Sequence, residues 1–489
     1  MRLRIELKEM KMKFGVALSA CILILLSSCN TSKTEPKNND EINLWAKRDS
    51  IVANVVPPTF PDKTFNILDF GAKGDGTTFN QNAFDQAIAE CTSNGGGKVI
   101  VPAGKFLTGP IHLDNNVNLH LEAGSEILFS TDLDHFPIVN TSYEGTEMYN
   151  FSPLIYANGK ENIAITGEGI LNGQASNEHW WPWCGKDFFG WKEGDPKQHT
   201  SLQVLKDEMS EKGVPVKNRI FGKGHYLRPT FIEPFECKNI LIQGVKIIDA
   251  PFWIIHPFRS ENIIVDAVNI ESHGPNNDGC DPEYSKNIII KNCRFNTGDD
   301  CIAIKAGRNE DGRRVGIKTE NIVIEDCIMI DGHGGVVIGS EMSAGVRNVF
   351  VDNCEMNSPN LDRAIRIKTN TKRGGTVENL YAKNLTIGQV KEAFLKVNLF
   401  YGIYANQDGE FMPEVKNVYL ENITVENGGK YGVLIDGYED HPVKDIVLKN
   451  VSIKKVDEDY SIKGAENIQF INTEINGKAY DFTFGKETH

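Results

Sequence analysis

The sequence predicts an all-β fold, a right-handed parallel β-helix with an N-terminal capping helix. A short phrase of alternating apolar and polar residues recurs from residue 161 to residue 475. No helical periodicity separates one phrase from the next. Repeats of this kind stack coil upon coil, so that each coil buries the apolar side of its neighbour.

Each phrase alternates for two short strands and then turns. Its second residue is Asn or Asp and falls at positions 239, 262, 287, 321, 348, 379, 417, 445 and 467, with intervals of 22 to 38 residues. Asn at the same place in successive coils predicts a side-chain ladder along one turn. Intervals longer than the minimum predict loops that leave the rod, usually on its binding side.

The ten cysteines include no C-x-x-C pair, so a structural zinc site is not expected. Cys293, Cys327 and Cys354 recur in the similar phrases KNCRF, EDCIM and DNCEM. We expect these three thiols to stack in the core, one coil above another.

A solenoid needs capped ends, and residues 80–94 (NQNAFDQAIAECTSN) supply one. Phe84, Ala87, Ile88 and Cys91 fall on one helical face, and the glycines at 95–97 end the helix.

The N-terminus has the pattern of a targeting segment. Lys11 and Lys13 precede an apolar run over residues 14–26, which has the length of a signal-peptide core. The run ends in LSSC, which resembles the bacterial lipoprotein cleavage box and implies that Cys29 is lipidated. An ordinary signal peptide with a spare cysteine is the alternative. We expect a signal peptide over residues 1–29, a flexible tether over 30–60 and the β-helix domain over 61–489. The chain would then be an exported lipoprotein anchored to a membrane, in the periplasm or on the outer surface of a bacterium.

The formal charge of −14 and the pI near 5.4 argue against nucleic acid as a partner, because phosphate binding needs a basic face. An acidic polysaccharide stays possible, because a local basic cleft can override the global charge.

Polar residues gather at corresponding places in four successive coils: Asn276-Asn277-Asp278, Gly298-Asp299-Asp300, Gly332-His333-Gly334 and Arg366-Ile367-Lys368. Corresponding turns of stacked strands lie about 4.8 Å apart. Three carboxylates, one histidine and two cations are therefore predicted to lie along one stripe of the rod.

NND, GDDC, GHG and RIK, in this order on a β-helix, resemble the four signatures of glycoside hydrolase family 28, the polygalacturonases and their relatives, which have the pectin-lyase-like solenoid. The resemblance covers about residues 65–480 and begins with FNILDFGAKGDGTT. It implies Asp299 as general acid, Asp278 and Asp300 as the residues that activate water, and His333 as a residue that tunes the acid. It also implies that Arg366 and Lys368 bind a substrate carboxylate and that Asn276 and Tyr401 bind substrate. Tyr404 is a weaker candidate for the family's tyrosine. No metal or other cofactor is required.

The chemistry agrees with the resemblance. Inverting glycosidases need one acid for the leaving oxygen and one carboxylate to activate water. Mutual repulsion within a cluster of aspartates keeps one of them protonated.

Several departures from the family pattern bear on specificity. The first motif reads NND rather than NTD, and Gly298 replaces the Gln common in endo-acting fungal members. The loop at 307–316, together with GSEMS at 339–343, resembles the exo-acting branch, and a loop that walls off one end of a cleft favours removal of terminal units. Arg308, Arg313 and Arg314 of this loop would hold the terminal uronate, or form only a solvated charged loop.

An insertion at about 174–236 carries Trp180, Trp181, Trp183 and Trp191. These rings either stack on sugars or, as we favour for most of them, form a small core of their own. His256 resembles a substrate-binding residue of exo-acting relatives, with a packing role as the alternative.

Together these observations predict a monomeric hydrolase of α-1,4-linked galacturonate in pectin, an acidic plant polysaccharide, acting by inversion from a chain end. A rhamnogalacturonan-directed hydrolase of the same family is the nearest alternative. A calcium-dependent pectate lyase and a non-catalytic glycan-binding surface lipoprotein are the alternatives from other classes.

Overall fold

The computed structural model describes residues 39–402 and 409–485, without the side chains of residues 39–44. The chain divides into a unit of residues 1–45 and a unit that begins at Ala46. The predicted signal peptide and its Cys29 lie outside the described residues, as does Tyr404.

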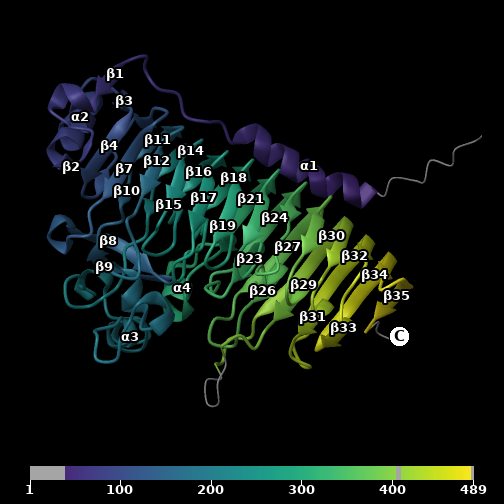
Figure 1. The fold of residues 1–489 in the computed structure, drawn as a ribbon. Coiled ribbons are helices and arrows are strands. Elements are labelled where there is room, and N and C mark those ends of the chain that lie inside the picture. The colour runs from purple at the N-terminus through teal and green to yellow at the C-terminus, as the bar shows by residue number, and fades with distance from the viewer. Residues whose placement is uncertain (1–38, 403–408, 486–489) are drawn as a thin grey trace, which may run out of the picture. The chain divides into compact units, whose positions relative to one another are not determined.

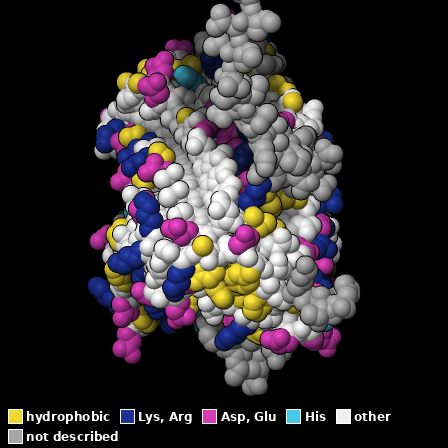
Figure 2. Space-filling view, turned by 90° about the vertical axis from the view of Figure 1, so that its right-hand side faces the viewer, with side chains coloured by type: hydrophobic (Ala, Val, Ile, Leu, Met, Phe, Trp, Pro, Cys, Tyr) yellow, Lys and Arg dark blue, Asp and Glu magenta, His cyan; other side chains and the backbone are white. Residues whose placement is uncertain are grey.

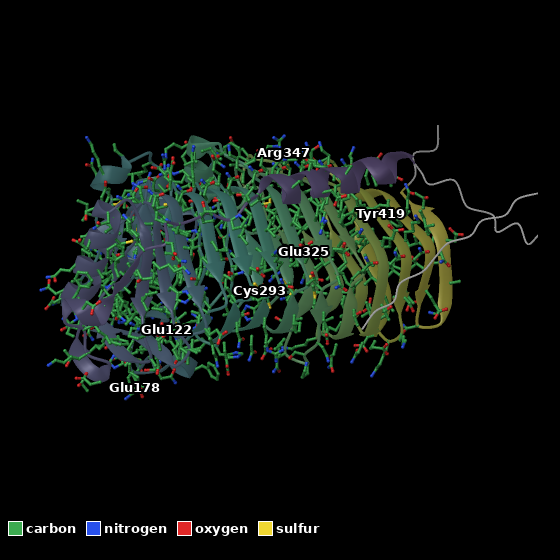
Figure 3. The ribbon with its side chains drawn as sticks, turned by 90° about the horizontal axis from the view of Figure 1, so that it is seen from above. Glu122, Glu178, Cys293, Glu325, Arg347 and Tyr419 are labelled. Atoms are coloured by element: carbon green, nitrogen blue, oxygen red, sulfur yellow. The ribbon has the colours of Figure 1, made fainter. Side chains whose placement is uncertain are left out.

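The second unit is a parallel β-helix with three faces, whose coils follow one another along a rod (Figures 1 and 3). The first face carries the recurring phrase and comprises β1 (Thr64–Asn66), β3 (Gly97–Val101), β6 (Val117–Leu121), β11 (Glu161–Gly167), β14 (Lys238–Gln243), β16 (Glu261–Asp266), β18 (Lys286–Lys291), β21 (Thr319–Glu325), β24 (Val346–Asp352), β27 (Thr376–Lys383), β30 (Glu414–Asn427), β32 (Val443–Ile453) and β34 (Ala465–Ile475).

The second face comprises β2 (Asp75–Phe79), β4 (Gly104–Thr108), β7 (Ser125–Phe129), β12 (Ile170–Asn172), β15 (Lys246–Ile248), β17 (Asn269–Ser272), β19 (Arg294–Thr297), β22 (Ile328–Asp331), β25 (Glu355–Met356) and β28 (Thr386–Gln389). The last of these pairs with the C-terminal part of β30, so the long strand joins the two faces.

The third face comprises β5 (Ile111–His112), β10 (Ile155–Asn158), β13 (Ile232–Phe235), β20 (Ile302–Ile304), β23 (Val336–Gly339), β26 (Arg363–Lys368), β29 (Ala393–Asn398), β31 (Tyr431–Asp436) and β33 (Glu458–Lys463). Single bridges through Ile255 and Cys280 connect β13 to β20.

An Asn ladder runs along the turn before the first face, as the sequence predicts. Each amide donates to the carbonyl oxygen of the Asn one coil earlier at 2.9–3.3 Å, from Asn417 back through Asn379, Asn348, Asn321, Asn287, Asn262, Asn239 and Asn162 to Asn116. All nine have φ between +55° and +64°. Asn tolerates this left-handed conformation better than other residues with a side chain, so the ladder and the turn select the same residue.

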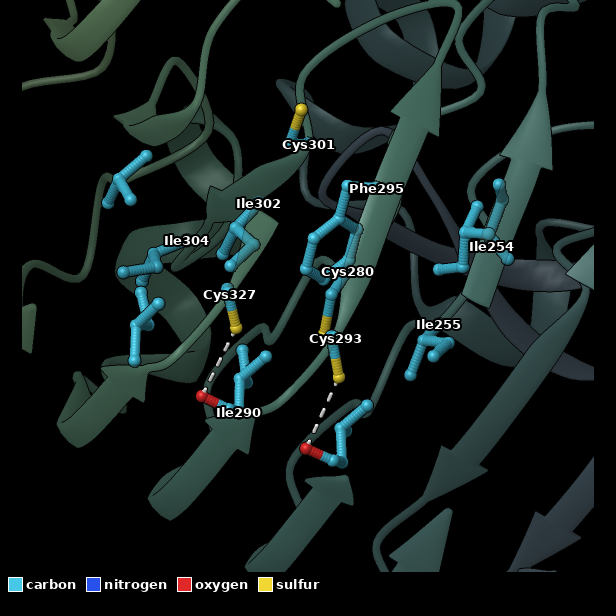
Figure 4. Packing of buried hydrophobic residues seen from close by; sticks show 14 of the residues in the cluster. Ile254, Ile255, Cys280, Ile290, Cys293, Phe295, Cys301, Ile302, Ile304 and Cys327 are labelled. Atoms are coloured by element: carbon cyan, nitrogen blue, oxygen red, sulfur yellow. Dashed lines mark hydrogen bonds between the residues drawn. The ribbon is translucent and has the colours of Figure 1, made fainter. Parts of the chain in front are cut away.

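The interior of the rod is a continuous column of apolar side chains. Cys327 interacts with the thiols of both Cys293 and Cys354. The Cys293 and Cys327 thiols also reach carbonyl oxygens of the preceding coil, at 3.6 and 3.7 Å (Figure 4). The eight described cysteines are all unpaired by disulfides, as expected for thiols that act as small core residues.

Both ends of the rod are closed. Helix α2 (Gln81–Ser93) buries Phe84, Ala87, Ile88 and Cys91, as predicted, and η1 (Ile67–Phe70) lies beside it. At the other end β35 (Lys478–Phe484) turns back antiparallel to β34 and packs aromatic rings against it. Figure 2 views the molecule from that side, with acidic and basic side chains interspersed around apolar ones.

Three segments leave the rod next to the third face, two before its strands and one after. The antiparallel hairpin of β8 (Ile138–Tyr143) and β9 (Thr146–Phe151) follows η2 (Leu133–His135). The insertion between β12 and β13 contains η3 (Trp181–Cys184), η4 (Asp187–Phe189), α3 (His199–Gln203), η5 (Val204–Ser210) and η6 (Val216–Asn218). Helix α4 (Asn309–Val315) occupies the loop that follows β20.

Helix α1 (Asn39–Asn54) corrects one expectation, because the sequence predicts a flexible tether over residues 30–60. Ile51 and Val55, one helical turn apart, are 7% and 5% exposed, and Arg48 pairs with Glu325 of β21. An apolar stripe and a fixed ion pair explain why this stretch is helical. No helix among the described residues is long and apolar enough to cross a membrane.

Candidate active site

Two tight turns position the aspartates. Asn277 is buried, and its side chain accepts from Ser272 and Gly274 and donates to two backbone carbonyls at 3.1 Å, which fixes the turn that carries Asp278. Gly298 lies so close to Gly274 that a Cβ at residue 298 would be 2.4 Å from its carbonyl oxygen. The two departures from the family pattern therefore belong to one packed pair of turns: Asn277 holds the first, and the second has no space for Gln at position 298.

The structure brings Asp278, Asp299 and Asp300 together, with one carboxylate oxygen of each within 4.8 Å of the others. The Nδ1 of His333 lies 2.9 Å from Oδ1 of Asp299. The Nζ of Lys368 lies 2.6 Å from Oδ2 of Asp300, which is completely buried. Residues more than 60 positions apart thus meet because their coils are stacked.

The surroundings give the acids of the cluster different proton affinities. Burial raises the pKa of Asp278 well above its usual range, and the negative charges of Asp281 and Asp299 add to this effect. Burial opposes ionisation of Asp299 as well, but the hydrogen bond and charge of His333 hold the pKa of Asp299 well below its usual range. The same hydrogen bond raises the pKa of His333 to about 9. In the free site Asp299 and His333 therefore form an ion pair at neutral pH.

Arg366, Tyr401 and Asn276, three of the predicted substrate-binding residues, lie beside this cluster. Arg366 lies 3.8 Å from Asp300, and the ring of Tyr401 faces both cations, 5.2 Å from Arg366 and 5.3 Å from Lys368. The side-chain oxygen of Asn276 accepts a hydrogen bond from Arg228 at 2.8 Å.

A cavity of about 420 Å³ opens at this point. Its lining comprises Glu144, Lys186, Trp253, Asn276, Asp278, Asp299, Lys305, His333, Ser340, Glu341, Asp362, Arg363, Arg366, Lys368 and Tyr401. Five of these are Lys or Arg and five are Asp or Glu, so the cavity is balanced in a chain whose formal charge is −14. An anionic sugar can bind here although the protein as a whole is acidic.

The segments that leave the rod form a wall beside the cavity. The amide of Arg308 donates to Gly145 in the β8–β9 hairpin at 3.0 Å, and Glu144 of the same hairpin pairs with Lys206 of the insertion. Arg219 of the insertion pairs with Asp311 of α4 at 2.6 Å, and both side chains are 1% exposed.

The side chains of the three arginines in the 307–316 loop have separate partners, of which one lies in the hairpin. The guanidinium of Arg308 lies 3.7 Å from Glu341, a residue that lines the cavity. Arg313 lies over the ring of Phe411 at 3.6 Å, and Arg314 pairs with Glu147 of β9 at 2.9 Å.

His256 is not a substrate contact, contrary to the sequence-based expectation. It is completely buried and donates from Nδ1 to Glu233 at 3.1 Å and from Nε2 to Glu283 at 3.0 Å. Glu233 accepts from Thr141 of the hairpin at 2.6 Å, and Glu283 accepts from the amide of Gly307 at 2.9 Å. His256 thus connects two glutamates that hold parts of the wall, a position that a lone histidine in the sequence does not reveal.

Trp180, Trp181 and Trp183 are packing residues, as favoured, but they extend the apolar core of the rod rather than form a core of their own. Trp180 is 3% exposed, with its ring 4.9 Å from Trp183 and 5.3 Å from Phe136. Trp181 donates to the carbonyl of Ala250 at 2.9 Å, which ties the insertion to the rod.

Sequence reasoning missed Lys305, Glu341 and Trp253, which all line the cavity. A signal for Lys305 was available, because the segment Ile304-Lys305 aligns with Ile367-Lys368 and strand alternation turns both lysines outward. Glu341 lies in the GSEMS stretch that the sequence singles out, whereas no comparable signal marks Trp253.

The three aspartates have the spacing of a group that could hold a metal ion. Ammonium groups already lie beside two of them, at 2.6 Å from Asp300 and 3.5 Å from Asp278. The positive charge that a cation would bring is thus partly supplied by lysines.

Comparison with known proteins supports the resemblance that the four motifs indicate. The family model named Glycosyl hydrolases family 28 matches residues 221–474, and one named Rhamnogalacturonase A/epimerase, pectate lyase-like, matches residues 64–186. A probable polygalacturonase of Vitis vinifera is 30% identical over 402 residues, covering 79% of this chain and 74% of its own. An exo-poly-alpha-D-galacturonosidase of Dickeya chrysanthemi is 28% identical over 393 residues, covering 75% of this chain and 62% of its own.

The crystal structure of a hyperthermoactive exopolygalacturonase from Thermotoga maritima superposes with a TM-score of 0.87 at 46% identity, covering 91% of this chain and 98% of that one. This match confirms the predicted right-handed parallel β-helix. Four short motifs that meet in one cavity, a family model over the same coils and these relatives lead to one conclusion: the chain belongs to glycosyl hydrolase family 28.

Proposed function

We propose that this protein hydrolyses α-1,4-galacturonosidic linkages of polygalacturonate from a chain end, with inversion at the anomeric carbon. The observation that carries the proposal is the cluster of Asp278, Asp299 and Asp300, with Arg366 and Lys368 beside it. All of these except the buried Asp300 line one cavity. Carboxylates supply the acid and base of glycoside hydrolysis, and a guanidinium with an ammonium group suits a uronate.

In the reaction, Asp299 donates a proton to the leaving glycosidic oxygen while a water molecule attacks the anomeric carbon from the opposite face. Asp278 and Asp300 bind this water and accept its proton. The Asp299–His333 pair stores the proton for the leaving group, because the 2.9 Å hydrogen bond lets it pass from Nδ1 to the carboxylate. A bound uronate brings negative charge near Asp299, which favours protonation of its carboxylate.

The closest carboxylate oxygens lie within 4.8 Å, whereas inverting enzymes usually have about 6.5–9.5 Å between their two carboxyl groups. Inversion is therefore proposed from the family and is tested directly. The anomeric signals of the first product, followed by NMR within seconds of mixing, should be those of the β-anomer. An α-anomer formed first would overturn this part of the proposal.

Action from a chain end is supported by the wall of hairpin, insertion and α4 beside the cavity. The relatives from Dickeya chrysanthemi and Thermotoga maritima carry exo-acting names. A wall at one end of a cleft favours binding of a terminal residue over binding of a chain that runs through.

The decisive experiment is a time course of products from polygalacturonate, separated by size, with and without chelator. Galacturonate alone from the earliest point, unaffected by chelator, is expected. A ladder of oligomers would mean internal cleavage, and unsaturated products lost with chelator would mean a lyase. Release from rhamnogalacturonan but not from polygalacturonate would favour the alternative that the match over residues 64–186 suggests.

For the location of the protein, the N-terminal pattern supports export and lipidation at Cys29. Metabolic labelling with radioactive palmitate in a bacterial host should mark the wild type and not Cys29→Ser. Equal labelling of both proteins would exclude this anchor.

A further inference from the structure

We propose that Lys305 is a positioning residue of this active site, which holds Asp278 as Lys368 holds Asp300 and His333 holds Asp299. Each carboxylate of the cluster then has its own cationic partner. The inference rests on the proposed function and adds to it a residue outside the four family signatures.

The surroundings of Lys305 support this role. Its Nζ lies 3.5 Å from Asp278, 3.5 Å from Asp281 and 3.6 Å from Glu341, and the side chain is 3% exposed. The ring of Trp253 lies 4.3 Å from the same nitrogen. Three carboxylates and one aromatic face leave the ammonium group little space for a further ligand, so we assign it to these acids rather than to substrate.

The stacking of the coils gives Lys305 and Lys368 equivalent places. Ile304 pairs with Ile338, which pairs with Ile367, so Lys305, Gly339 and Lys368 follow one another in the same column. Gly339 has no side chain to place between the two lysines, and a Cβ there would be 2.1 Å from the carbonyl oxygen of Lys368. The column therefore presents two ammonium groups, one to each carboxylate that binds the attacking water.

The charges around Asp278 show what the lysine does. Burial, Asp281, Asp299 and Asp300 all raise the pKa of Asp278, and Lys305 is the cation that lowers it. A carboxylate must be ionised to accept a proton from water. Without Lys305, Asp278 would hold its proton to a higher pH, and the enzyme would lose activity first on the acidic side of its pH profile.

Lys305→Met tests this role, because it retains the aliphatic stem and removes the charge. The acidic limb of kcat/KM on polygalacturonate should move to higher pH by about one unit or more, with at least tenfold lower activity at pH 5 and a smaller loss at pH 8. KM should change less than kcat. Lys286→Met, which removes a half-exposed lysine paired with Glu261 at 2.8 Å, is the matched control and should keep the wild-type profile.

Asp281→Asn provides the opposite perturbation and does not depend on the stability of the first variant. It removes the carboxyl group of Asp281, which raises the pKa of Asp278, and should move the acidic limb to lower pH. The double variant Lys305→Met/Asp281→Asn should return the limb toward the wild-type position.

An unchanged limb in both single variants would overturn the inference. So would a rise in KM at constant kcat in Lys305→Met that Asp281→Asn does not relieve, because that pattern would make Lys305 a substrate contact. Wild-type protein without activity on polygalacturonate would refute the proposed function instead, so the two failures are distinguishable.

Discussion

Asp299→Asn gives the sharpest test of the proposed chemistry. Asparagine retains the shape of the side chain and an oxygen that can accept from the amide of Asp300, now at 3.0 Å, and from Nδ1 of His333, now at 2.9 Å. The turn should therefore persist, and only the transferable proton and the negative charge are removed.

The expected effect has two parts. Loss of a general acid lowers kcat by about 10²- to 10⁴-fold, which corresponds to about 2.7–5.4 kcal/mol at 1.36 kcal/mol per decade. The pKa of His333, raised to about 9 chiefly by its hydrogen bond to Asp299, should fall toward its ordinary value of about 6.5. Because the His333 side chain is 53% exposed, no stability change is calculated from this pair.

The assay combines two substrates with one titration. Release of galacturonate from polygalacturonate should fall by the stated factor, whereas an aryl galacturonoside, whose leaving group needs no protonation, should lose much less activity. The carbon-bound ring protons of His333, followed by NMR against pH, report its pKa.

Asp300→Asn is the matched control, because loss of a water-binding carboxylate should slow both substrates equally. Equal loss on both substrates in Asp299→Asn would refute the assignment of Asp299 as acid. If Asp278→Asn alone spared the aryl substrate, Asp278 would be the acid instead.

Three further predictions concern the wall and the rod. Asp311→Ala leaves the buried Arg219 without its carboxylate and should lower the free energy of unfolding by about 3–5 kcal/mol. If Asp311 also holds the wall, the size-separated products of this variant should include oligomers. The control Arg314→Ala changes a side chain that is 39% exposed and should release only monomer. Burial opposes the charge of His256, but its hydrogen bonds to Glu233 and Glu283 raise its pKa to about 9. The stability of the wild type relative to His256→Gln should therefore be greatest below about pH 6.5 and should be lost as the pH rises through about 9. A difference in melting temperature that does not change with pH would contradict this. Asn321→Ala removes two ladder hydrogen bonds of 3.0 Å and places alanine at φ +60°. It should lower the free energy of unfolding, measured by chemical denaturation, by about 2–4 kcal/mol. Asn321→Gly should lower it by about 1 kcal/mol less, and equal losses in the two variants would exclude the backbone contribution.

Prediction from sequence succeeds where successive coils require the same residue type at the same position. The Asn ladder is visible because the left-handed turn needs Asn in coil after coil, and Cys293, Cys327 and Cys354 are visible because the same core position recurs. The prediction of a tether is wrong for the opposite reason. Ile51 and Val55 belong to no repeat, and only the folded structure shows that they are buried.

The same distinction separates the site residues that could be predicted from those that could not. The motifs place Asp278, Asp299, Asp300, His333, Arg366 and Lys368 on one stripe because coil stacking is periodic, and the structure brings these residues together. His256 was misassigned because its partners, Glu233 and Glu283, lie 23 and 27 residues away and belong to no motif.

The sequence by itself determined the parallel β-helix, its cap and the line of charged residues, because these follow from a period and an alternation that every coil repeats. Only the tertiary structure decided that Lys368 faces Asp300, that Lys305 faces Asp278 and that three inserted segments contact one another beside the cavity. These contacts depend on side-chain direction and on loops that occur once, and the energy of a buried charge is set by all its neighbours together rather than by its place in the chain.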